Sequence, residues 1–223
     1  MKKITQIIAA IILTCALNKS LAQNINWRNL EPSQKHIITV NGNFDNAVTL
    51  GVGYGYHLKT KLPIVLNIEY SMPMGKSLFD DLKTKIGGQI ELVRINNFST
   101  TVKAYGIIRR FENDFARFIN FGSEFSALSG YYKQKWYVAG ELGFDKAIVT
   151  HVKHSALMKQ YNPSLVNGWY IPTGGNFFYG VQSGLTIGSN DVNIRIGKTI
   201  EQDFKTNPLV PFYFQLGWNK RFR

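Results

Sequence analysis

The chain has 223 residues, a formal net charge of +12 and a single cysteine. Its apolar content of 44% and its 20 glycines suit one ordered domain and exclude a disordered or collagen-like chain. The lone cysteine excludes a scaffold held together by internal disulfide bonds.

The first 22 residues have the pattern of a secretory signal peptide. Lys2 and Lys3 precede an apolar stretch, and the small residues Ser20 and Ala22 precede a cleavage site at Gln23. The apolar stretch is too short to cross a membrane as a helix. The predicted mature chain starts at Gln23 and has no cysteine, and its net charge falls to +9 because the leader contains three lysines.

A lipoprotein signal is the alternative interpretation of the same leader. Such a signal places Gly, Ala or Ser before the cysteine that receives the lipid. Thr14 stands before Cys15 here, so the pattern favours an ordinary secretory signal peptide that is cleaved before Gln23.

After residue 22, apolar and polar residues alternate in segments of about ten residues, which is the pattern of β-strands. No window approaches about 18 consecutive apolar residues, so no transmembrane helix is predicted. The first segment is the weakest, and eight strands remain an alternative that would require a different division of residues 110–135. The ten predicted strands are His36–Phe44, Asn46–His57, Leu62–Met72, Leu82–Leu92, Phe98–Arg109, Phe115–Tyr131, Trp136–Phe144, Phe177–Ile187, Val192–Ile200 and Phe212–Phe222.

The face opposite the apolar one distinguishes a soluble sheet from a membrane barrel. In a soluble sheet it would meet water and carry long polar side chains, but here it is crowded with glycines that alternate with charged residues of both signs. A narrow barrel lumen needs this combination, because small residues leave room for charged side chains that must pair when they are desolvated. The predicted polar network of the lumen consists of Glu69, Lys85, Glu91, Lys103, Glu124, Glu141 and Arg195.

The apolar face then meets hydrocarbon, and a sheet in lipid must close so that no backbone group is left unpaired. With both termini in the periplasm, the three longest connections, 73–81, 147–175 and 201–211, face outside, as in outer-membrane barrels. We therefore predict an all-β protein, a closed antiparallel transmembrane β-barrel over residues 36–223. Residues 23–35 are predicted to form a periplasmic N-terminal segment.

On these features the chain resembles the small outer-membrane β-barrel proteins of Gram-negative bacteria over nearly all of residues 36–223. Its closing strand resembles the terminal signal that the barrel-assembly machinery reads, although Arg223 follows the last aromatic residue and Lys220 lies on the apolar face. The resemblance implies an outer-membrane location and assembly by that machinery, and it implies no catalytic residues. The alternating residues of the closing strand are Phe212, Phe214, Leu216, Trp218 and Phe222.

The 147–175 connection contains the candidates for a metal site. His151 and His154 are three residues apart, and a helical turn within Val149–Gln160 would place them on one face near Tyr161. No third ligand follows at a recognised spacing and there is no His-Glu-x-x-His motif, so solvated histidines are the alternative. We predict no metal and no cofactor.

A lipid-modifying hydrolase would need a nucleophile, a base and an orienting acid near the outer rim. Ser155 beside His154, with Asp145 or Glu141 on the preceding strand, is the cluster that could supply them. Sequence neighbours do not face each other on a helix, so we predict no catalytic residues.

The positive charge has a local interpretation in the outer connections. The leader takes the chain out of reach of nucleic acid, so a nucleic-acid partner is not predicted. Lys76, Lys153, Lys159 and Lys205 could contact lipopolysaccharide phosphates, with solvated surface charge as the alternative.

We therefore predict a non-enzymatic outer-membrane barrel whose lumen is filled by side chains and whose long outer loops bind a surface partner or lipid. A barrel of about ten strands holds side chains rather than a wide channel. The alternatives are a lipid-modifying hydrolase with its site in the 147–175 connection and a narrow pore for small solutes.

Overall fold

The computed structural model describes residues 23–44, 48–73, 81–172, 174–205, 208 and 210–223. The predicted signal peptide at 1–22, the junction of the first two predicted strands at 45–47 and Lys76 lie outside these residues.

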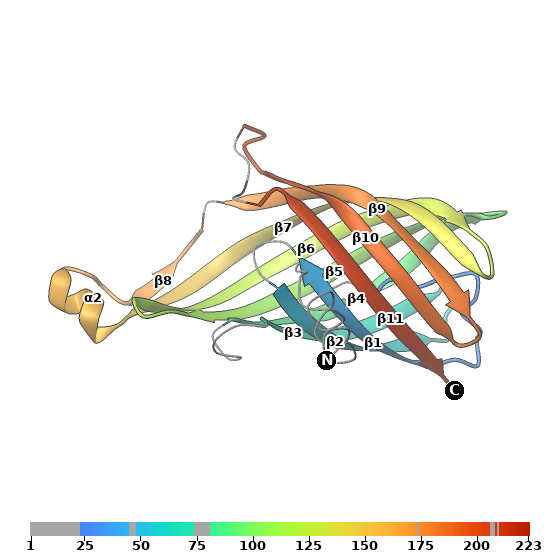
Figure 1. Cartoon of the computed structure of the whole chain (residues 1–223), viewed down its shortest axis with the longest axis horizontal. Helices are drawn as coiled ribbons and strands as arrows, with labels where there is room; N and C mark the ends of the chain where they lie inside the picture. The colour runs from blue at the N-terminus through green and yellow to red at the C-terminus, as the bar shows by residue number, and fades with distance from the viewer. Residues whose placement is uncertain (1–22, 45–47, 74–80, 173, 206–207, 209) are drawn as a thin grey trace, which may run out of the picture.

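Ten long strands form one antiparallel sheet that closes into a barrel (Figure 1). They pair in the order β1-β11-β10-β9-β7-β6-β5-β4-β3-β2. Strand β1 also lies beside β2, which closes the barrel. The backbone N–H of His57, in β2, donates to the carbonyl of Lys35, just before β1, at 2.8 Å. This closure confirms the predicted ten-stranded barrel rather than an eight-stranded one. The strands are β1 (His36–Phe44), β2 (Val48–Leu58), β3 (Ile64–Pro73), β4 (Asp81–Ile95), β5 (Phe98–Glu112), β6 (Ala116–Tyr132), β7 (Trp136–His154), β9 (Gly175–Ile187), β10 (Asn190–Glu201) and β11 (Phe212–Phe222).

The barrel has a polar interior and an apolar exterior, the reverse of a soluble protein. Among the described residues, 29 buried side chains are polar or charged and 13 are apolar. Large apolar side chains are exposed along every long strand, as Leu50, Val52, Tyr54 and Tyr56 are on β2. Such a surface would be unstable in water and suits hydrocarbon.

Inward-facing glycines provide the space that the lumen side chains occupy. A Cβ atom on Gly143 would lie 2.2 Å from Cζ of Phe178, and one on Gly197 would lie 2.3 Å from the hydroxyl oxygen of Tyr213. Both distances are far below van der Waals contact, so these rings occupy their positions because their neighbours lack side chains.

Tight connections mark one rim of the barrel. Strand β1 begins there and β11 ends there, and the connections at residues 96–97 and 188–189 have two residues each. Asn96 and Gly188 adopt positive φ angles of 54° and 61°. Asn and Gly are the residues that tolerate this left-handed backbone best. This rim is the periplasmic one, because outer-membrane barrels have short periplasmic turns.

Strands β5, β6 and β7 extend well beyond the barrel at the opposite rim (Figure 1). They contain 15, 17 and 19 residues, whereas about 9–11 suffice to cross a bilayer. The extension ends in the short helix α2 (Ala156–Tyr161) and in β8 (Gly168–Tyr170), which pairs with β7. No helix in the described part of the chain is long and apolar enough to cross a bilayer.

The predicted end of the seventh strand at Phe144 was wrong by ten residues. Phe121 pairs with Val149 and Gly122 pairs with Ala147, so Ile148 is an extra residue in a β-bulge. The alternation of exposed and buried residues that the prediction followed ends at Gly143, and the bulge then shifts it by one position although the strand continues.

Candidate functional site

The first described residues, 23–27, lie inside the barrel, and we call this segment the plug. The sequence predicts a periplasmic segment over residues 23–35, and the structure instead places the first five of these residues in the lumen. Ile25 and Trp27 pack against Tyr132 and Tyr137 near the periplasmic rim, in a cluster of buried apolar side chains. The polar side chains of the plug find their hydrogen-bond partners on the barrel wall.

Gln23, at the inner end of the plug, is bonded to four strands through its backbone and its side chain. Its backbone N–H donates to Oε1 of Glu69 at 2.7 Å, and its side-chain amide donates to Oγ1 of Thr39 at 2.8 Å. Its carbonyl accepts from Nε2 of Gln89 at 3.0 Å and from Nζ of Lys103 at 3.4 Å. A Cβ atom on Gly55 would lie 2.3 Å from Oε1 of Gln23, so this glycine makes room for the amide.

The next plug residues contact the opposite wall of the barrel. Nδ2 of Asn24 donates to Oδ1 of Asn193 on β10 at 3.2 Å. Nδ2 of Asn26 donates to Oγ1 of Thr186 on β9 at 2.9 Å and to the carbonyl of Lys133 at 2.9 Å. The plug is thus held from all sides of the lumen and not from one strand alone.

Ion pairs link buried side chains of the lumen, two of them between strands that lie one strand apart in the barrel. Nζ of Lys85 lies 2.5 Å from Oε2 of Glu124, with both side chains at most 3% exposed. Arg195 donates to Glu141, and its guanidinium carbon lies 4.6 Å from the ring centroid of Tyr213. Near the periplasmic rim, Arg94 pairs with Glu91. Arg221 and Asp191 form a further buried pair, which the alternation pattern did not predict.

The structure places all seven residues of the predicted polar network inside the barrel. Each of them is at most 5% exposed. The pairing scheme among them was not predictable, because it depends on the register of strands that lie near each other only in the closed sheet. The plug residues were not predicted, although the alternate apolar residues Ile25 and Trp27 are a signal that this segment is buried.

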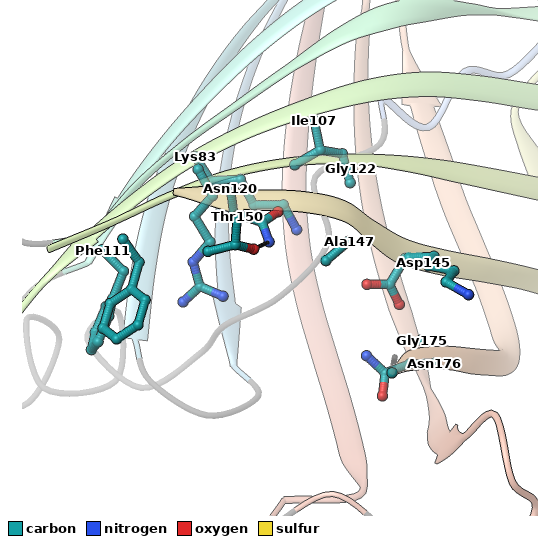
Figure 2. Close-up of a pocket in the computed structure, with 14 residues that line it drawn as sticks. Lys83, Ile107, Phe111, Asn120, Gly122, Asp145, Ala147, Thr150, Gly175 and Asn176 are labelled. Atoms are coloured by element: carbon teal, nitrogen blue, oxygen red, sulfur yellow. Dashed lines mark hydrogen bonds between the residues drawn. The ribbon is translucent and has the colours of Figure 1, made fainter. Parts of the chain in front are cut away.

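A cavity of about 470 Å³ lies on the outer side of the lumen (Figure 2). Its wall mixes both charges with amides and hydroxyls, and Nδ2 of Asn120 donates to Oγ1 of Thr150 at 2.8 Å. Asp145 on β7 and Asn176 on β9 lie close to each other at the edge of this cavity in Figure 2. Other residues in the wall are Lys83, Arg109, Lys146 and Phe118.

The candidate catalytic residues do not form a triad in the structure. Ser155 caps α2, and its Oγ accepts from the Met158 backbone N–H at 3.2 Å. The side chain and backbone of His154 face Oδ1 of Asn167. Asp145 lies nine residues before His154 on the same strand, a separation of about 30 Å at a rise of about 3.3 Å per residue.

The candidate metal ligands lie on a strand rather than on a helix. His151 and His154 belong to β7, where residues three apart point to opposite faces. His151 instead packs against Trp169 of β8, with ring centroids 4.9 Å apart. Among the described residues there is no group of three His, Cys, Asp or Glu residues that could hold a metal ion.

Three of the four candidate lysines for lipopolysaccharide are described, and all three are exposed on the outer side. Lys153 lies on the extended part of β7, Lys159 lies in α2, and Lys205 lies in the connection between β10 and β11.

A closed antiparallel barrel with a polar interior, an apolar exterior, tight turns at one rim and long extensions at the other defines the chain as an integral β-barrel protein of the outer membrane. No family model and no curated protein matches it.

Solved structures align with it only loosely. A KdgM porin in complex with disordered oligogalacturonate has a TM-score of 0.43 at 8% identity, over 84% of this chain and 99% of that one. A second structure of the KdgM porin has a TM-score of 0.41 at 8% identity, with the same coverage. OmpTdeltaL8, a loop-deletion mutant of an outer membrane protein of Vibrio cholerae, has a TM-score of 0.28 at 8% identity, over 96% of this chain and 72% of that one. Likeness at this level says nothing about what this chain binds or transports.

Proposed function

We propose that this chain is a non-enzymatic outer-membrane barrel, closed by its own plug, that binds a ligand on its outer side. The observation that supports closure most directly is the plug itself. Residues 23–27 donate hydrogen bonds to β1, β3 and β9, and they accept hydrogen bonds from β4 and β5. Ions cannot pass a lumen section that holds a backbone segment together with paired side chains.

Planar-bilayer conductance tests this proposal. The wild-type barrel should be indistinguishable from a protein-free bilayer, and a variant without residues 23–30 should conduct. The variant Ser155→Ala, which alters only the cap of the distant helix α2, is the matched control and should stay closed. Steady conductance by the wild type that is unchanged in the deletion variant would refute closure by the plug.

A second candidate function, a gated pore for small solutes, is favoured by two observations. The plug is held by hydrogen bonds of mainly neutral groups, and the cavity of about 470 Å³ lies on the outer side of the lumen. Voltage-dependent openings of the wild type that disappear when the plug is tethered by an engineered disulfide would support the pore.

The outer ligand that the charge pattern favours is lipopolysaccharide. Exposed lysines outside the membrane can each form charge-assisted hydrogen bonds with phosphate oxygens. Binding of the detergent-solubilised barrel to lipopolysaccharide should weaken when Lys153, Lys159 and Lys205 are replaced together by Gln. A control variant with Lys59 and Lys61 replaced by Gln, in the exposed periplasmic turn, should bind like the wild type. Equal weakening by both variants would show only a dependence on net charge.

A further inference from the structure

The buried carboxylate of Glu69 takes part in no ion pair among the described residues. Four ion pairs account for the other buried acids, and neither Glu69 nor Lys103 takes part in them. Lys85 stands opposite Glu69 in the register of β3 and β4, but its ammonium group donates to Glu124. A buried carboxylate without a counter-charge is strongly destabilising.

Within the described part of the chain, the backbone nitrogen of Gln23 is the one group that donates to Glu69. It donates to Oε1 at 2.7 Å, whereas Oε2 has no hydrogen-bond partner and Glu69 as a whole is 2% exposed. An amide nitrogen has one hydrogen and no charge. It therefore provides a hydrogen bond to one of the two carboxylate oxygens and does not offset the negative charge of Glu69.

Gln23 is also the predicted first residue of the mature chain. Hydrolysis of the bond between Ala22 and Gln23 adds water across it, leaving a carboxyl group on Ala22 and an amino group on Gln23 that takes up a proton. The same nitrogen then has three hydrogens and a positive charge.

We propose that Glu69 is a binding site for the α-ammonium group of the mature chain, which removal of the leader creates at Gln23. The ammonium group places a positive charge in direct contact with Glu69 and can donate to Oε2 as well as to Oε1. The other groups of Gln23 position it, because Thr39 accepts from the side-chain amide and Gln89 donates to the carbonyl. Anchoring of the plug is thereby coupled to processing of the leader, since the unprocessed chain offers Glu69 only a neutral amide.

An N-terminal glutamine can lose its free amine in a competing cyclisation reaction. The free amine can attack its own side-chain amide carbon, expel ammonia and form a neutral lactam. In this structure the Gln23 amide is held by Asn67 and Thr39 on the lumen wall. The docked residue is therefore expected to keep its amine.

The first measurement is the intact mass and N-terminal peptide of the protein purified from outer membranes. The expected result is a chain that starts at Gln23 with a free amine. A different first residue, or a mass lower by one ammonia, would overturn the proposal.

The second measurement is the rate at which a small water-soluble succinimidyl ester acylates the α-amine of the folded barrel, read on the N-terminal peptide and normalised to the urea-unfolded protein. Loss of a charge-assisted hydrogen bond should raise this rate about tenfold or more in Glu69→Gln. The matched control is Glu91→Gln, which removes a buried carboxylate that bonds Arg94 and Ser99 instead of Gln23. Equal rates in the wild type and Glu69→Gln would refute the assignment.

A second variant keeps the test decisive if Glu69→Gln does not fold. One glycine inserted after Ala22 moves the ammonium group about 3.5 Å along the chain while Glu69 stays in place. Its α-amine should also react about tenfold faster than that of the wild type. Unchanged protection of the displaced amine would count against a specific site at Glu69. Acylation reports the position of the amine and conductance reports closure, so this proposal and the proposed function fail independently.

Discussion

Removal of one partner from the Arg195–Glu141 pair should destabilise the barrel severely. The two side chains come from β10 and β7 and are 1% and 0% exposed. Arg195→Ala leaves Glu141 charged and buried, which costs about 3–5 kcal/mol. The guanidinium carbon also lies 4.6 Å from the Tyr213 ring centroid and 5.3 Å from that of Phe178, and loss of these contacts adds about 0.5–2 kcal/mol. We expect the free energy of unfolding to fall by about 4 kcal/mol or more.

The assay is reversible urea unfolding of the barrel refolded in phospholipid vesicles, followed by tryptophan fluorescence. The matched control is the double variant Arg195→Met, Glu141→Gln. It should recover more than half of the loss, because it leaves no unpaired charge. A loss below about 1 kcal/mol in the single variant would mean that the pair behaves like a solvated one. A double variant as unstable as the single one would show that packing, and not charge, dominates at this position.

Two other predictions concern the lipid-facing surface and the outer tip. Val181 is exposed on β9 opposite Gly140, near the middle of the apolar band. Val181→Arg should therefore lower the free energy of unfolding by about 2–4 kcal/mol in the same assay. The control Leu157→Arg, in α2, should change it by less than about 0.5 kcal/mol. At the exposed tip of β5 and β6, the hydrogen bond from Arg117 lowers the pKa of Glu112 below its ordinary value. The pair therefore stabilises the folded state at a pH above the pKa of Glu112 in the unfolded chain. This stabilisation is lost as the pH falls through the pKa of Glu112 in the folded chain. Arg117→Ala should raise the pKa of Glu112, as measured by NMR titration of its side-chain carbonyl carbon, and an unchanged titration would disprove the pairing.

Local alternation was sufficient to find the ten strands because each strand of a barrel has one face in lipid and one in the lumen. Leu50 to Tyr56 follow that rule residue by residue. The rule fails at Ile148, where a bulge inserts one residue and the strand continues for six more residues to His154. A bulge is defined by pairing with the neighbouring strand, so a single segment of sequence does not display it.

The plug shows the same limit more strongly. Residues 23–27 are too few to show a period of their own, and Gln23 and Asn24 form hydrogen bonds with partners between 14 and 195 residues away in the chain. Glu69 illustrates the point, because alternation predicts that it faces the lumen but does not indicate that Gln23 reaches it. The closed barrel brings the two together.

The sequence by itself determined the class of this protein. Glycines and paired charges on one face of alternating strands suit a narrow lumen, whereas the same face of a soluble sheet would meet water and carry long polar side chains. The sequence also determined which rim carries the short turns, because turn lengths are local. The tertiary structure decided how the buried charges pair, how far β7 extends and what closes the lumen. Those features depend on contacts between residues that are distant in the sequence, and such contacts exist only after the strands have paired and the sheet has closed.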